Sequence, residues 1–252
     1  MCDKKDYQSL LGKLMWVSKL RVDVMFSTNL LCRQLKGPSN AAMKALKRTM
    51  KYLKTYPDVN LKINNEKCLN LIIFADASFA NDHSKRSIGG SICFIGNTLI
   101  SAYSKTQPWV ATSTAQAELM EIYRAVTMEK WIRGIFKDFG ISLGISLIFT
   151  DSLAALHIIK SEVLLKKTKF LATKRKFIQA AEEEHMIKVV KIAGTSNPAD
   201  VLTKVPTKEM SSKSRILSEN AQILGMPVNY YGQDMIISEL ISKLSPKVPK
   251  SL

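Results

Sequence analysis

The pattern of apolar and polar residues changes character along the chain near Pro57. Before it, residues 7–55 have a helical pattern, and residues 41–56 repeat apolar positions at spacings of three and four between lysines and an arginine. Asn40 is the expected N-cap of that last helix, after a turn that contains Pro38. This helix is either an ordinary basic surface helix or one that lies along a phosphate backbone. The pattern therefore predicts a small helical segment before Pro57.

After Pro57 the apolar runs are short and rich in β-branched residues, as in buried strands. Strands are predicted at residues 69–74, 91–95, 98–103, 145–150 and 186–192. Helices are predicted at residues 113–139, 152–160 and 168–184, and another begins at Pro198. The turn at Gly96-Asn97 makes the second and third strands a hairpin, whereas helices separate the later strands. The expected fold class is α/β, a mixed five-stranded sheet flanked by helices and preceded by the small helical segment.

The net charge narrows the class of partner. The chain has 37 Lys and Arg residues against 21 Asp and Glu residues among 252, which gives a formal charge of +16. Such a charge indicates a polyanionic partner, nucleic acid first and an anionic membrane surface second, although a solvated lysine-rich face is the plain alternative. No apolar run reaches the roughly 18 residues of a membrane span. The sequence also lacks the pattern of a secretory signal.

Cysteine and histidine are too sparse and scattered for a zinc site. The four cysteines form no C-x-x-C pair, and the chain has only three histidines. A disulfide framework is equally unexpected, and the composition fits a reducing intracellular compartment. Any metal site should therefore be built from oxygen ligands.

Four acidic residues stand where such a site could form. Asp76 follows the first predicted strand and Asp151 follows the fourth. If these strands are neighbours, the two carboxylates emerge side by side, and divalent cations would relieve their repulsion. Glu118 lies on the helix that crosses the sheet, and Asp200 lies in the first turn of the last helix. Each has an ordinary alternative as a turn residue, a solvated helix residue or a charge favoured by the helix dipole, and Glu121 competes with Glu118.

A ligand set of four carboxylates without His or Cys is typical of sites for hard cations. It suits Mg²⁺ or Mn²⁺ rather than zinc. Two such ions about 3.5–4 Å apart can activate a water and stabilise the leaving oxygen of a phosphodiester. Together with the basic composition, the set indicates a metal-dependent nuclease.

Sequence blocks around these acids resemble the Pol polyproteins of copia/Ty-type LTR retrotransposons. They are FADASFAND (74–82), KRSIGGSICFIGNTLISAYSKTQ (85–107), ATSTAQAELMEI (111–122), FTDSLAALHIIKS (149–161) and NPADVLTK (197–204). The resemblance implies a ribonuclease H-like domain with two Mg²⁺ or Mn²⁺ ions, and it favours Glu118 over Glu121. Its catalytic and metal-binding residues would be Asp76, Glu118, Asp151 and Asp200. Residues 168–172 lack the histidine that the family usually has there, which predicts a slower reaction.

The first part of the chain extends the resemblance. Residues 7–31 and 45–56 are similar to the end of the family's reverse transcriptase, its thumb and connection. The implied domains are a thumb-like segment at 1–67, a ribonuclease H-like domain at 68–206 and a C-terminal tail at 207–252. The sequence contains no polymerase motif of the Y-V-D-D type, so DNA polymerisation is not expected.

The resemblance implies endonucleolytic hydrolysis of the RNA strand of RNA–DNA hybrids within a retrotransposon polyprotein. Its partners would be the hybrid and the upstream reverse transcriptase, in the cytoplasm, inside virus-like particles, or in the nucleus. The expected contacts to nucleic acid are Lys105, Thr106, Gln107, Lys166, Lys167, Lys169, Lys174 and Arg175. Each lysine has the alternative of being a solvated surface charge. The rival functions are a truncated non-catalytic remnant or hybrid-binding module, and an integrase, which the order Asp, Glu, Asp, Asp disfavours.

Overall fold

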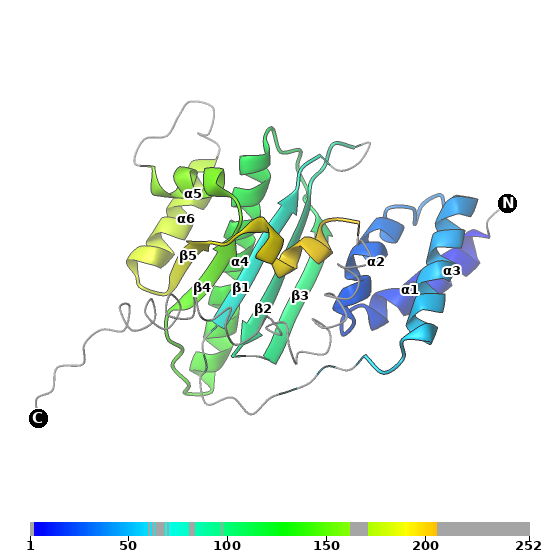
Figure 1. Cartoon of the computed structure of the whole chain (residues 1–252), viewed down its shortest axis with the longest axis horizontal. Coiled ribbons are helices and arrows are strands. Elements are labelled where there is room, and N and C mark those ends of the chain that lie inside the picture. The colour runs from blue at the N-terminus through cyan, green and yellow to red at the C-terminus, as the bar shows by residue number, and fades with distance from the viewer. Residues whose placement is uncertain are drawn as a thin grey trace, which may run out of the picture.

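The computed structural model places three helices before a five-stranded sheet (Figure 1). It describes residues 3–59, 61, 63, 69, 71–80, 84–96, 98–161 and 171–205, so the predicted tail at 207–252 lies outside the described residues. The first helices are α1 (Lys4–Val17), α2 (Met25–Cys32) and α3 (Asn40–Thr55), with a 3₁₀ turn, η1, at Val22–Val24. Within the described part of the chain, none of the helices has the length and apolar character needed to span a membrane.

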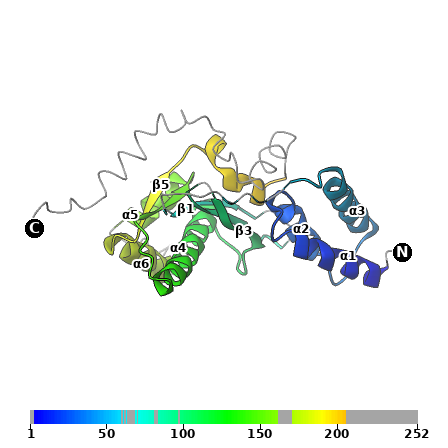
Figure 2. The same ribbon diagram turned by 90° about the horizontal axis from the view of Figure 1, so that it is seen from below.

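The sheet contains both antiparallel and parallel strands. Its strands are β1 (Leu71–Ser78), β2 (Ile88–Ile95), β3 (Thr98–Thr106), β4 (Ser146–Thr150) and β5 (Ile187–Lys191), in the spatial order β3-β2-β1-β4-β5. β2 pairs antiparallel with β1 and β3, whereas β4 runs parallel to β1 and β5. Helices α4 (Thr114–Asp138), α5 (Leu153–Lys160) and α6 (Ala172–Glu183) cover one face, and the short 3₁₀ helix η4 (Pro198–Leu202) lies on the other (Figure 2). The predicted mixed five-stranded sheet flanked by helices is confirmed.

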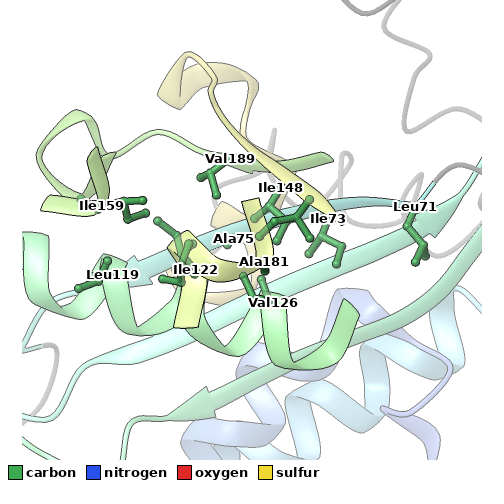
Figure 3. Close-up of a cluster of buried hydrophobic side chains, with 14 of the residues drawn as sticks. Leu71, Ile73, Ala75, Leu119, Ile122, Val126, Ile148, Ile159, Ala181 and Val189 are labelled. Atoms are coloured by element: carbon green, nitrogen blue, oxygen red, sulfur yellow. The ribbon is translucent and has the colours of Figure 1, made fainter. Parts of the chain in front are cut away.

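Side chains alternate between the two faces of the sheet and build two cores. On the α4 face, β1 contributes Ile73 and Ala75 to a cluster with α4, α5 and α6 (Figure 3). On the other face, Phe74 stacks on Phe149 with ring centroids 5.1 Å apart, and η4 adds Leu202. Because both faces are buried, the central strands are nearly continuous apolar runs.

The ends of the helices follow local capping chemistry. Ser113 caps α4 by accepting a backbone hydrogen bond at 3.2 Å, and Gly140, with a φ of 73°, lies just beyond its C-terminus. The expectation that Asn40 caps α3 is wrong. Ser39 is the N-cap, because its hydroxyl accepts a hydrogen bond from the Ala42 N–H at 3.1 Å.

The N-terminal helices pack against the edge of the sheet. α2 lies beside β3 (Figures 1 and 2), where Arg33 donates a hydrogen bond to Thr106 Oγ1 at 2.9 Å. Val22 and Met25 enter the core between the sheet and η4. This packing shields the outer edge of β3 from pairing with another chain. The boundary between the first two predicted domains stays a prediction, but the two parts share a core.

Gly90 on β2 lies where η4 comes close to the sheet. A Cβ at this position would be 2.5 Å from the Cβ of Leu202. Gly90→Ala should therefore lower the free energy of unfolding by about 1–3 kcal/mol, measured by urea denaturation. Gly12→Ala is the control, because a Cβ there meets nothing within 4 Å and should stabilise α1 by up to about 1 kcal/mol. Equal effects of the two substitutions would contradict this close packing.

Candidate active site

Asp76 and Asp151 lie side by side, each directly after the last residue that pairs β1 with β4, at the carboxyl end of this parallel ladder. The last pair in the β1–β4 ladder is Ala75 with Thr150, so the two aspartates are the first residues beyond it. β1 and β4 are neighbours, which meets the condition under which the two carboxylates emerge side by side. The predicted end of the first strand is wrong, because β1 continues through Asp76 to Ser78 by pairing with β2.

Asp200 reaches the same edge from η4. Asn197 fixes the start of η4, because its side-chain amide donates to the Ala75 carbonyl at 3.0 Å and its Oδ1 accepts from the Ala199 N–H at 3.1 Å. Each of the three aspartates places a carboxylate oxygen within 4.8 Å of those of the other two. Asp76 is the most buried of them, at 1% exposure. The sheet and η4 together therefore bring three carboxylates into one cluster.

Glu118 approaches this cluster from α4 and is almost fully buried. The backbone of Ala77 donates a hydrogen bond to its carboxylate, and Glu118 Oε2 has no hydrogen-bond partner among the described residues. Burial, and then the charges of Asp76 and Asp151, raise the pKa of Glu118 to about 9. Burial likewise raises the pKa of Asp76 to about 7, although Lys204 acts in the opposite direction. The surroundings therefore disfavour full ionisation of the four acids, and without a bound cation the cluster favours protonation of Glu118.

Lys204 contacts two members of the cluster. Its Nζ lies 2.6 Å from Asp200 Oδ1 and 3.8 Å from Asp76 Oδ2. Partial burial opposes the charge of this lysine, but Asp76 and Asp200 outweigh burial and raise its pKa. The Thr203 hydroxyl adds a hydrogen bond to Asp76. A lysine and a hydroxyl thus offset part of the carboxylate charge.

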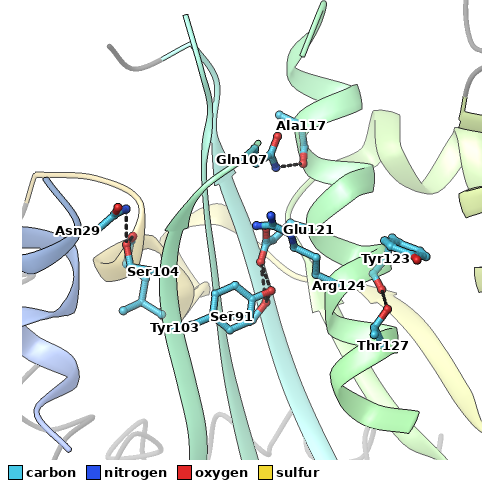
Figure 4. A network of polar contacts seen from close by, with 11 residues as sticks. Asn29, Ser91, Tyr103, Ser104, Gln107, Ala117, Glu121, Tyr123, Arg124 and Thr127 are labelled. Atoms are coloured by element: carbon cyan, nitrogen blue, oxygen red, sulfur yellow. Dashed lines mark hydrogen bonds and ion pairs between the residues drawn. The ribbon is translucent and has the colours of Figure 1, made fainter. Parts of the chain in front are cut away.

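Glu121, the competing acid on α4, lies in a different environment. Its carboxylate accepts hydrogen bonds from Tyr103 and, at 3.1 Å, from Ser91 on the neighbouring strands (Figure 4). A Cβ at Gly89 would overlap Glu121 Oε2, so this glycine leaves room for the side chain. Glu121 therefore attaches α4 to the sheet, while Glu118 faces the aspartates.

The expected nucleic-acid contacts differ in how accessible they are. Lys105 is exposed on β3, and Lys174 is half-buried on α6 with its Nζ 5.6 Å from the centre of the Trp109 ring. Thr106 accepts hydrogen bonds from Arg33 and is occupied by contacts to α2. Three of the expected contacts lie outside the described residues: Lys166, Lys167 and Lys169. Of the expected lysines within the described residues, Lys105 and Lys174 remain candidate contacts to nucleic acid.

Two of the expected contacts are buried, which corrects the sequence expectation. Gln107 is fully buried and donates to the Ala117 carbonyl at 2.9 Å (Figure 4). Arg175 is 3% exposed and donates to the Ser161 carbonyl at 2.7 Å. Both side chains hold segments of the protein together and are not available to a substrate.

Three residues that shape the site were not predicted from the sequence: Asn197, Thr203 and Lys204. All three lie in the same block as Asp200, and this proximity was the available signal. Their orientation depends on the turn after η4, in which the N–H groups of Thr203 and Lys204 donate to the Asp200 carbonyl at 3.1 and 3.0 Å. A pattern of residue types does not encode this turn.

Most of the chain has known relatives, although no family model matches it. The Retrovirus-related Pol polyprotein from transposon RE2 of Arabidopsis thaliana is 28% identical over 204 residues, which are 80% of this chain and 14% of that polyprotein. The transposon Ty1-NL2 Gag-Pol polyprotein of Saccharomyces cerevisiae is 24% identical over 205 residues, which are 79% of this chain and 12% of that polyprotein. The chain thus spans a small part of the length of these relatives. The predicted resemblance to copia/Ty-type Pol polyproteins is confirmed.

Two solved structures are similar to part of the chain. LC11-RNase H1 in complex with an RNA/DNA hybrid matches 53% of this chain and 94% of that protein, at 17% identity and a TM-score of 0.42. The prototype foamy virus protease–reverse transcriptase matches 60% of this chain and 22% of that protein, at 15% identity and a TM-score of 0.40. The strand order and directions described above, rather than these scores, define the fold.

The raised pKa of Glu118 predicts how stability depends on pH. An acid whose pKa is higher in the folded than in the unfolded state makes the protein less stable as pH rises between the two values. In chelator-treated protein, Glu118→Gln should therefore raise the free energy of unfolding by more than about 1 kcal/mol near pH 8 and have little effect near pH 4. Urea denaturation at both pH values measures this difference. Glu183→Gln, an exposed change on α6, is the control, and the same pH dependence in both variants would refute the prediction.

Proposed function

We propose that this chain, whose relatives are Pol polyproteins of copia and Ty1-type retrotransposons, hydrolyses the RNA strand of RNA–DNA hybrids. The observation that carries the proposal is the convergence of four carboxylates from separate segments: Asp76, Glu118, Asp151 and Asp200. Holding carboxylates together in a partly buried place is costly unless cations bind there, so a purely structural role explains them poorly.

The donor set fits divalent metal ions. Three aspartate oxygens lie within 4.8 Å of one another, and the adjacent Glu118 has a buried oxygen without a hydrogen-bond partner among the described residues. Such an all-oxygen set is what Mg²⁺ and Mn²⁺ prefer. In the proposal the four acids hold two such ions, which when bound supply an activated water and stabilise charge on the phosphodiester oxygens.

The remaining residues position the acids and the substrate. Asn197 keeps Asp200 at the sheet edge, and Gly194 leaves room for Asp151, because a Cβ there would be 3.1 Å from Asp151 Oδ2. Lys105 and Lys174 are proposed to contact the phosphate backbone. The 2′-hydroxyls in the shallow minor groove would distinguish the RNA strand. The proposed setting is a retrotransposon polyprotein beside its reverse transcriptase, in the cytoplasm or the nucleus.

Asp151→Asn tests the proposed reaction with little change in side-chain shape. The parent chain should cleave a labelled RNA–DNA hybrid with Mg²⁺ or Mn²⁺, and the variant should be slower by about 100-fold or more. The reason is that a lost charged ligand removes several kcal/mol of transition-state stabilisation. Single-turnover cleavage resolved on gels measures both rates. The exposed change Glu183→Gln is the control and should keep the parent rate.

Other outcomes of this assay lead to different conclusions. Cleavage by Asp151→Asn at the parent rate would contradict the assignment of the site. Salt-dependent binding of the hybrid with no cleavage in either metal would favour the hybrid-binding module. Cleavage of double-stranded DNA at the same rate as the hybrid would contradict the proposed substrate.

A further inference from the structure

Lys204 lies where a cation would be expected to bind. Its Nζ is 2.6 Å from Asp200 Oδ1 and 3.8 Å from Asp76 Oδ2, within the cluster that also contains Asp151. The lysine side chain is 44% exposed. Because a lysine ammonium sits on a flexible four-carbon stem, it can move toward solvent while the backbone of η4 stays in place.

The turn after η4 directs this lysine into the cluster. Lys204 follows Asp200 by four residues, and its N–H donates to the Asp200 carbonyl at 3.0 Å, so the two side chains lie on the same side of the turn. Thr203, the residue before it, donates a hydrogen bond to Asp76 and attaches the same turn to the sheet. The backbone therefore positions the ammonium next to the carboxylates.

We propose that Lys204 is a built-in counter-cation that a divalent ion must displace from the carboxylate cluster. This inference rests on the metal site of the proposed function and adds a device that controls its occupancy. The ammonium carries a single charge, whereas the cluster gathers four acids. Among the four acids, Lys204 Nζ forms ion pairs within 4 Å with Asp200 and Asp76 but not with Asp151 or Glu118, so the lysine compensates the cluster only in part. A divalent ion compensates more charge and can replace the lysine.

Lys204 has opposite effects on the stability of the fold and on the affinity for metal. Without added metal, Lys204 stabilises the fold by offsetting the repulsion between Asp76 and Asp200. With metal, it lowers the affinity, because binding of the ion must break the Lys204 contacts. A lysine that merely positioned Asp200 as a ligand would raise the metal affinity instead. The two roles therefore predict changes of opposite sign when the lysine is replaced.

Lys204→Met removes the charge and keeps an unbranched side chain. Mn²⁺ binding to the chelator-treated full chain, followed by electron paramagnetic resonance of the free ion without nucleic acid, should be about threefold to tenfold tighter in the variant than in the parent. Thermal unfolding without metal should occur at a lower temperature. Lys176→Met, an exposed change on α6, controls for the loss of one positive charge and should alter neither measurement.

The outcomes separate this inference from the proposed function. Saturable Mn²⁺ binding by the parent, with unchanged or weaker binding by Lys204→Met, would overturn the inference and leave the metal site in place. No saturable binding by either protein would overturn both. Adding Asp151→Asn to each background should weaken Mn²⁺ binding. Tighter binding by Lys204→Met that survives this second change would mean that the ion binds elsewhere, which would also overturn the inference.

Discussion

The parallel pairing of β1 with β4 is the interaction on which the rest of the site depends. Its register ends at Ala75 with Thr150, and a slip of one residue would move Asp76 to the opposite face of the sheet. The pairing is stabilised by apolar side chains on both faces, including the stacked rings of Phe74 and Phe149. The sheet is therefore stable for reasons unconnected with the carboxylates, and it can support the cost of placing two of them side by side.

Close packing around this pairing requires two adjacent glycines on β2. Gly90 lies opposite Asp76 and admits η4, which carries Asp200 to the sheet edge. Gly89 admits the buried carboxylate of Glu121, which hydrogen bonds attach to the strands. Two acids three residues apart on α4 thus differ in role. Glu121 Oε1 accepts hydrogen bonds from Ser91 and Tyr103 on the sheet, whereas Glu118 faces the carboxylates of Asp76 and Asp151.

Features that depend on residues close together in the sequence could be predicted from it. β-branched runs and helical spacing indicated the mixed sheet and its helices, and the four acids stood in blocks of recognisable type. Features that depend on contacts between distant segments could not be predicted. Arg175 lies in a sequence typical of a basic surface helix, yet it is buried and its guanidinium donates a hydrogen bond to the Ser161 carbonyl. Gln107 follows an edge strand and is buried against α4. The contact of Lys204 with Asp76 requires the turn after η4, which residue types alone do not specify.

We propose that Asp76, Glu118, Asp151 and Asp200 bind divalent cations at one end of the sheet. A crystal structure of the chain with Mn²⁺, with anomalous scattering measured at the manganese edge, would locate the bound ions. We expect anomalous density in contact with carboxylate oxygens of the aspartates and of Glu118, with the Lys204 ammonium moved away from them. Anomalous density elsewhere on the protein, with Lys204 still against Asp200 and no ion at the cluster, would contradict the proposed metal site.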